Sequence, residues 1–231
     1  MPKAQLNDLF SALSGSLGDV VITSGKRGTV LRKKPAFPRP TSPEQKITEN
    51  CLVTANTVWS TFTSQEAEMW NDYALTVTHH NAQADTRYHP TGYHAFIALT
   101  LKFLQVTPTA IVPRTPPTRK FTPDDFTVTL AIENGTLIFL ANGINSPNTE
   151  TELLLQVLPN PRRKPTAKYH SEAFVKFTAL APFYALTVAP GAYAAAYRFV
   201  NTETGQMRPL VTLGKSEVIA AVVARSERKA A

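Results

Sequence analysis

Two closely spaced helix starts within residues 41–74 most constrain the fold of this chain. Ser42 stands before a proline and three residues ahead of Gln45, the order of an N-cap, a first helical residue and a capping-box partner. Thr63 and Glu66 repeat the same spacing. Each cap stabilises its helix by roughly 1 kcal/mol. The sequence therefore predicts two consecutive helices joined by a short turn.

Apolar residues recur at helical spacing behind both caps. They are Ile47, Cys51, Ala55, Val58, Trp59 and Phe62 in the first helix, and Ala67, Trp70, Tyr73 and Ala74 in the second. A third helix begins at Gly92 and is apolar on more than one side, so we expect it to be largely buried. Trp59, Trp70 and Phe96 are expected to form the helical core. The single cysteine, Cys51, excludes an internal disulfide and is expected to be a buried, inert thiol.

The positive charge is concentrated at the N-terminus. Residues 1–40 carry seven basic and two acidic side chains, a net charge of +5, whereas residues 41–105 carry three basic and six acidic ones, a net charge of −3. The formal charge of the whole chain is +7. Two β-branched runs, at 19–24 and 29–34, flank a glycine-bounded turn and predict a hairpin. Because a lone hairpin is weakly stable in water, it needs another sheet or a subunit.

Five basic residues of this hairpin form the candidate interaction surface: Lys26, Arg27, Arg32, Lys33 and Lys34. Three interpretations remain open, namely a solvated turn, a docking surface for an acidic protein, and a ribbon that touches nucleic-acid phosphates. The low aromatic content argues against base stacking. An amphipathic helix is expected before the hairpin at 6–13, and a proline-rich extended arm after it at 35–40.

A proline-rich segment at 106–122 separates the helical pattern from a β pattern, and we expect a domain boundary there. The expected strands are 126–132, 136–141, 152–158, 173–180, 183–188, 193–200 and 208–213, with Asn134-Gly135 as a hairpin turn. Seven short strands in about 100 residues predict an antiparallel β-sandwich. Residues 190–193, Pro-Gly-Ala-Tyr, resemble the entry to the tyrosine-bearing strand of immunoglobulin-like and fibronectin type III domains.

The expected fold class is therefore α+β with two domains. The first combines a small β-hairpin with helices, and the second is an antiparallel β-sandwich of the immunoglobulin or fibronectin type III kind. The expected segments are 1–40 (helix, basic hairpin and arm), 41–105 (three helices), 106–122 (linker), 123–215 (β-sandwich) and 216–231 (a tail for which we favour a helix).

Four histidines, His79, His80, His89 and His94, are the candidate metal ligands. A zinc or iron site needs three or four of them to converge, and their spacing matches no His-Glu-x-x-His motif. A solvated or interface loop explains them as well, and we favour it. No pair of carboxylates marks an acid–base site. We expect no metal, no cofactor and no enzymatic activity.

No signal peptide and no run of 18 apolar residues is seen, so we expect synthesis in the cytoplasm and no membrane span.

Residues 14–105 resemble a module of uncharacterised phage and prophage proteins, in which a basic hairpin precedes a proline-started helix and a tryptophan-bearing second helix. The matching pattern is Gly15-x-x-Gly18, Gly28-x-Val30-x-Arg32, Thr41-x-Pro43-x-Gln45, Trp59, Thr63-x-x-Glu66-x-x-x-Trp70 and Gly92-x-x-x-Phe96. The chain departs from that pattern in its long histidine loop.

This resemblance implies a non-enzymatic structural or assembly subunit of a phage-like particle, such as a capsid decoration, minor capsid or tail-associated protein. Its partners would be other virion or assembly subunits, in a homo- or hetero-oligomer. A nucleic-acid-binding protein that uses the basic hairpin is the alternative. A metal-dependent enzyme that uses the histidine loop is the third interpretation.

Overall fold

The computed structural model describes residues 3–4, 15–25, 28–34, 42–81, 85–133 and 135–218. Within these ranges the chain is mixed α+β, with three helices and four antiparallel sheets. The chain divides into two units, Met1–Lys46 and Ile47–Ala231. The helix expected at 6–13, the arm at 35–40 and the tail beyond Val218 lie outside the described residues.

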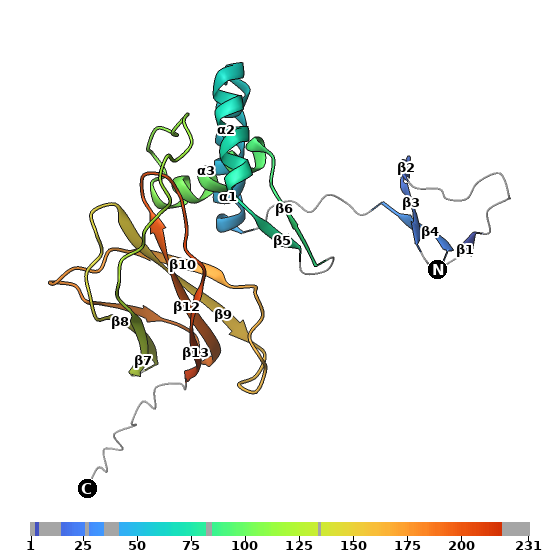
Figure 1. Ribbon diagram of the computed structural model, residues 1–231. Coiled ribbons are helices and arrows are strands. Elements are labelled where there is room, and N and C mark those ends of the chain that lie inside the picture. The colour runs from blue at the N-terminus through green and yellow to red at the C-terminus, as the bar shows by residue number, and fades with distance from the viewer. Residues whose placement is uncertain are drawn as a thin grey trace, which may run out of the picture. The chain divides into compact units, whose positions relative to one another are not determined.

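The first unit contains one four-stranded sheet, ordered β1-β4-β3-β2 (Figure 1). Its strands are β1 (Lys3–Ala4), β2 (Gly15–Leu17), β3 (Val20–Gly25) and β4 (Gly28–Lys33). The expected hairpin is the centre of this sheet, since Val20 pairs with Lys33 and Gly25 with Gly28. The two outer strands were missed because two or three residues are too few to show an alternating pattern.

Three helices open the second part of the chain: α1 (Pro43–Ser60), α2 (Ser64–Thr76) and α3 (Gly92–Val106). Both predicted capping boxes are confirmed. The Ser42 hydroxyl accepts the Gln45 N–H at 3.1 Å, and the Gln45 side chain accepts the Ser42 N–H at 3.3 Å. Thr63 and Glu66 exchange the same two bonds at 3.3 and 2.8 Å. Local capping chemistry is sufficient to set where these helices start.

A short ribbon of two strands, β5 (His79–Asn81) and β6 (Thr86–Tyr88), occupies the segment where a loop was expected. Its side chains are polar and largely exposed, so no apolar alternation reveals it in the sequence. His79 stacks on Tyr88 across the ribbon, with ring centroids 5.6 Å apart. This cross-strand pair helps to set the register.

Seven further strands form two antiparallel sheets, ordered β10-β9-β12-β13 and β11-β8-β7. They are β7 (Val128–Glu133), β8 (Thr136–Ala141), β9 (Thr149–Leu158), β10 (His170–Val175), β11 (Phe183–Thr187), β12 (Gly191–Asn201) and β13 (Val211–Val218). Gly135, at φ 79°, lies in the predicted turn between β7 and β8. Residues 216–218 belong to β13, so no helix starts at Ser216.

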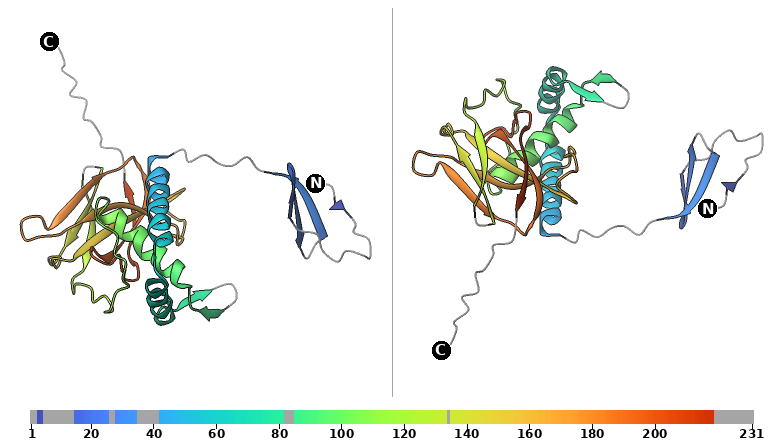
Figure 2. Two further views of the ribbon diagram at one scale, coloured as in Figure 1. Left: turned by 90° about the horizontal axis from the view of Figure 1, so that it is seen from above. Right: turned by 90° about the horizontal axis from the view of Figure 1, so that it is seen from below.

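The two sheets share one hydrophobic core, to which Leu137 and Phe139 contribute from β8 and Leu153 and Leu155 from β9. The central strands β9 and β12 are also buried on their other face, where Glu152 is fully buried. There the Nζ of Lys102 on α3 lies 2.9 Å from the Glu152 carboxylate. Helix α3 therefore lies beside the second face of this sheet (Figure 2).

The proline-rich segment is bonded both to the helices and to the sheets. The Trp70 indole N–H donates to the Arg114 carbonyl oxygen at 2.8 Å, and the Gln206 side chain donates to the Arg119 carbonyl oxygen at 3.2 Å. From Ile47 on, the helices and the sheets formed by β7–β13 accordingly belong to one unit of the chain.

Candidate interaction surface

The side chains of the N-terminal sheet divide between its two faces according to the strand register. One face, called the apolar face here, carries Val20, Ile22, Leu31 and Lys33, and the other carries Val21, Thr23, Val30 and Arg32. The consecutive basic residues Arg32 and Lys33 therefore lie on opposite faces. Each face combines apolar side chains with one basic residue near the end of the sheet.

The apolar side chains described on this sheet are only partly buried. Among the described residues of the first unit, Thr29 is the only buried one. Val20 is 36% exposed, and Ile22 and Leu31 are half-buried. Complete burial of one such side chain contributes about 1.5–3 kcal/mol relative to full exposure. A partner that covered this face would therefore stabilise the sheet.

The predicted basic surface is described only in part. Lys26 and Arg27 lie outside the described residues. Arg32, Lys33 and Lys34 are exposed, and the Lys34 N–H donates to the Asp19 carbonyl oxygen at 2.6 Å, which closes the open end of the hairpin.

Helix α2 presents an acidic, partly apolar outer face formed by Glu68, Asp72 and Leu75. These residues stand at i, i+4 and i+7, so they share one side of the helix, opposite the buried Trp70 and Ala74. Leu75 is 64% exposed. Within the described ranges neither carboxylate forms an ion pair. Like charges four residues apart destabilise a helix by about 0.2–0.5 kcal/mol, so a cationic partner would be stabilising here.

Helix α1 is also poorly covered. Of its described side chains only Cys51 and Ala55 are buried, whereas Ile47 is 55% and Val53 59% exposed.

Burial raises the pKa of the Cys51 thiol. The thiol therefore stays protonated at neutral pH and is a weak nucleophile.

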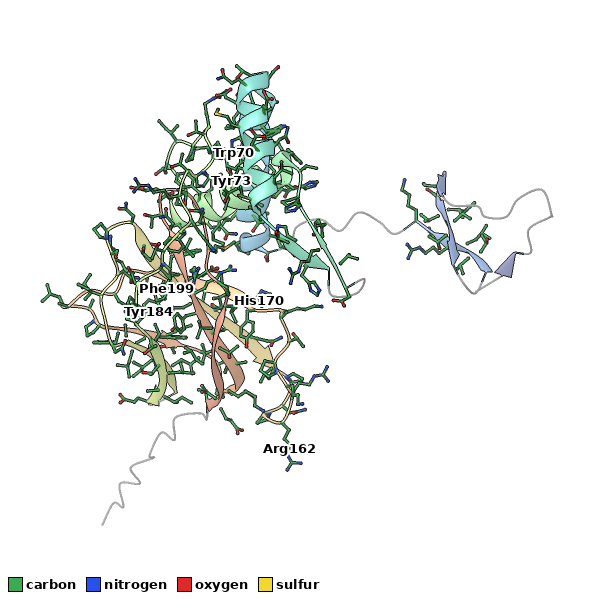
Figure 3. The ribbon with its side chains drawn as sticks, viewed as in Figure 1. Trp70, Tyr73, Arg162, His170, Tyr184 and Phe199 are labelled. Carbon is green, nitrogen blue, oxygen red and sulfur yellow. The ribbon has the colours of Figure 1, made fainter. Side chains whose placement is uncertain are left out.

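Of the three residues expected in the helical core, Trp59 and Trp70 both pack against the third, Phe96. The Phe96 ring is fully buried, and its centroid lies 5.4 Å from that of Trp59 and 5.1 Å from that of Trp70. Trp70, on α2 (Figure 3), is buried, whereas Trp59 is only half-buried. Phe62 completes the cluster at 5.0 Å from Phe96.

The four histidines each have a local contact and do not converge. The His80 Nε2 lies 2.9 Å from the Asp85 carboxylate, and the His89 Nδ1 lies 2.8 Å from the Val77 carbonyl oxygen. The His94 backbone N–H donates to the Thr91 hydroxyl at 3.3 Å, which caps α3. Within the described ranges, no three His, Cys, Asp or Glu side chains are grouped so that they could hold a metal ion.

A buried ion triad between helix and sheet was not predicted. The Glu152 carboxylate, fully buried, accepts from Lys102 Nζ at 2.9 Å and from Arg198 Nε at 2.5 Å. The Lys102 ammonium also contacts the Gln105 side chain at 2.6 Å and lies 5.2 Å from the centre of the Phe174 ring. A signal in the sequence that could have indicated it is a single charged residue inside an apolar run, because charged residues are rarely buried unless they are paired.

The charges of this triad depend on one another. Burial lowers the pKa of Lys102, and the Glu152 carboxylate only partly offsets that effect. Burial alone would raise the pKa of Glu152, but hydrogen bonds and charge attraction from Arg198 and Lys102 hold it below its ordinary value. A buried ion triad of this kind fixes the position of α3 on β9 and β12.

A second ion pair joins the proline-rich segment to the start of α2. The Arg114 guanidinium donates to both Glu66 carboxylate oxygens, at 2.5 and 2.9 Å, and to the Thr61 carbonyl oxygen at 2.8 Å. It also lies 4.8 Å from the centre of the Phe62 ring. The Arg114 bond and the capping bond with Thr63 lower the pKa of Glu66 to about 2.

Two cavities lie beside the proline-rich segment. One, of about 470 Å³, is polar and includes Arg119, Asn148 and Gln206 in its lining. The other, of about 250 Å³, is bounded by Trp70, Phe103 and several prolines.

In the described part of the chain no helix is both long enough and apolar enough to cross a membrane. Comparison with protein-family models and with curated proteins finds no match for this sequence.

Proposed function

We propose that this chain is a non-enzymatic structural subunit of a phage-like particle, anchored through its N-terminal region to neighbouring subunits. The observation that carries this proposal is the incomplete burial of the N-terminal sheet, in which Thr29 is the only buried residue among those whose burial is described. A sheet whose described apolar side chains are only partly buried gains only part of the hydrophobic effect, which is the dominant favourable term in folding. Contact with a neighbour supplies that burial.

Helix α1 supports the same interpretation. It runs for 18 residues, yet only Cys51 and Ala55 are buried among its described side chains. Most helical stability in proteins comes from the packing of one face against other elements, and short isolated helices are marginal in water. The exposed Ile47 and Val53 are therefore surface that a neighbouring subunit would cover. The resemblance of residues 14–105 to phage proteins points to a virion as the assembly.

For the C-terminal part we propose a β-sandwich of the immunoglobulin or fibronectin type III kind, which would project from the particle or brace it. The strand orders β11-β8-β7 and β10-β9-β12-β13 support this proposal, because they place strands two and five of the seven together and strands three and six together. The Tyr193 hydroxyl donates to the Ala189 carbonyl oxygen at 2.7 Å, as in the tyrosine corner of such domains.

Sedimentation velocity of the full chain over a range of concentrations tests the proposed function. We expect the sedimentation coefficient to rise with concentration, because the uncovered surface drives association. The variant V20S/I22S/L31S, which makes the apolar face polar, should remain monomeric. L180S is the matched control, since Leu180 is 99% exposed in a loop of the second unit. A wild-type chain that stays monomeric at every concentration would contradict the proposal.

Binding of nucleic acid through the N-terminal hairpin is the second candidate, favoured by the exposure of Arg32, Lys33 and Lys34. If about seven phosphates are contacted, the logarithm of the binding constant should fall with the logarithm of salt concentration with a slope near −6. Binding that does not depend on salt would exclude it.

A further inference from the structure

We propose that the partner of the N-terminal sheet is a second copy of this chain, whose helix α2 packs against the apolar face of the sheet. This inference rests on the proposed function and names the neighbour that function requires. Identical subunits joined through two different surfaces form rings or filaments, since each copy offers one surface of each kind.

The two surfaces are chemically complementary. The apolar face presents Ile22 and Leu31, half-buried, beside the exposed ammonium of Lys33. The outer face of α2 presents Leu75, 64% exposed, beside the carboxylates of Glu68 and Asp72. Apolar side chains would meet apolar side chains at the centre of such a contact, with opposite charges around them. That is the usual anatomy of a protein interface.

The net charges of the segments that contain the sheet and the helix are also of opposite sign. Residues 1–40 carry a net charge of +5 and residues 41–105 a net charge of −3. The sequence of α2 contains no Lys or Arg. Within the described ranges Arg114 pairs with Glu66 and leaves Glu68 and Asp72 without an ion pair. Complementary potentials of this kind speed encounter and fix which surfaces pair.

Other parts of this chain complement the basic sheet less well than α2 does. The sequence of residues 219–231 contains Arg225, Arg228 and Lys229 against one glutamate, so the C-terminal end of a neighbour would repel the basic sheet. The polar cavity near Arg119 is lined by two cations, Arg119 and Lys120, against one carboxylate, Glu203, so it would not attract a basic sheet. Helix α1 also exposes apolar side chains, Ile47 and Val53, but it carries the basic Lys46 beside them, whereas α2 contains no Lys or Arg.

Charge reversal tests this pairing. One variant, R32E/K33E, reverses the charge on both faces of the sheet, with Lys33 on the apolar face and Arg32 on the other, and a second, E68K/D72K, reverses the charge on the helix. Each alone should raise the concentration needed for half-assembly at least about tenfold, because like charges would then face each other. A mixture of the two variants in equal amounts should restore assembly, since each sheet then finds a helix of opposite charge on the other variant.

The matched controls change the net charge equally but at other places in the second unit. R162E/R163E lies in the β9–β10 loop (Figure 3), and E172K/E217K lies on exposed positions of β10 and β13. Neither should alter assembly. Circular dichroism and melting of every variant establish that it is folded before its assembly is measured.

The outcomes distinguish this inference from the proposed function. A wild-type chain that never assembles contradicts both. If the wild type assembles but R32E/K33E assembles equally well, or if the mixture fails to restore assembly, the pairing is wrong while the proposed function stands. If the quadruple variant R32E/K33E/E68K/D72K regains the wild-type behaviour while the mixture does not, the sheet docks on its own chain. If R32E/K33E loses only nucleic-acid binding, the sheet serves that ligand instead.

Discussion

Replacing Glu152 with glutamine should destabilise the second unit of the chain more than any surface substitution. Glutamine keeps the shape of the side chain but removes its charge. The Lys102 ammonium and the Arg198 guanidinium would then face each other near a buried site that has lost its counter-ion. The Glu152 side chain is fully buried, so water cannot replace the lost charge without rearrangement.

The expected loss is roughly 3–5 kcal/mol in the free energy of unfolding, the range found when one partner of a buried ion pair is removed. The control E150Q changes a half-buried glutamate of the same strand that lies outside the triad, and it should cost less than about 1 kcal/mol. The variant K102M/E152L/R198M, which replaces all three charges by apolar side chains, should be close to neutral or stabilising.

Urea unfolding measures this effect with two probes. Tryptophan fluorescence reports on the helices, since Trp59 and Trp70 lie on α1 and α2, and far-ultraviolet circular dichroism reports on helices and sheets together. Because the triad joins α3 to β9 and β12, both transitions should shift by the same amount. A loss below about 1 kcal/mol for E152Q, or a shift in only one probe, would refute the reasoning.

Two further predictions concern single contacts. Contacts in the folded chain lower the pKa of Glu66 from 4.5 to about 2. Its carboxylate therefore stabilises the fold fully at pH values above 4.5, and this contribution is lost as the pH falls from 4.5 towards 2. Melting temperatures across that range should show this loss, and R114M should reduce it. G205A should destabilise by about 2 kcal/mol or more, because φ is +71° there and an added Cβ would lie 2.1 Å from a carbonyl oxygen of α3. The control is G214A: φ is +108° there, but an added Cβ would meet no atom within 4 Å, so this variant measures the cost of the backbone conformation alone. Equal losses of unfolding free energy for the two variants in urea would disprove the clash.

The parts of the fold that local chemistry controls could be predicted from the sequence. Ser42 and Thr63 begin their helices as expected, since an N-cap acts within four residues. Each of the seven predicted strands of the second unit overlaps an observed strand, with ends displaced by up to five residues, as at 173–180 against β10 (His170–Val175) and 208–213 against β13 (Val211–Val218). Strand ends are the least certain part of such predictions.

The parts that depend on distant residues could not be predicted. Strands β1 and β2 exist only through pairing with the hairpin, and the β5–β6 ribbon has no apolar alternation. The Lys102–Glu152–Arg198 triad joins residues up to 96 positions apart, so a local pattern can mark a single buried charge but not its partners. Arg32 and Lys33 lie on opposite faces because consecutive side chains of a strand alternate, so the predicted strand at 29–34 already implies this split.

Hydrogen exchange of the amides in β3 and β4, measured at low and high protein concentration, tests most directly whether the N-terminal sheet depends on a neighbour. If it does, these amides exchange quickly in dilute monomer and become protected as the chain assembles, while amides of β9 and β12 are equally protected at both concentrations. Strong protection of β3 and β4 in the most dilute monomer would contradict the account, because the sheet would then be stable alone.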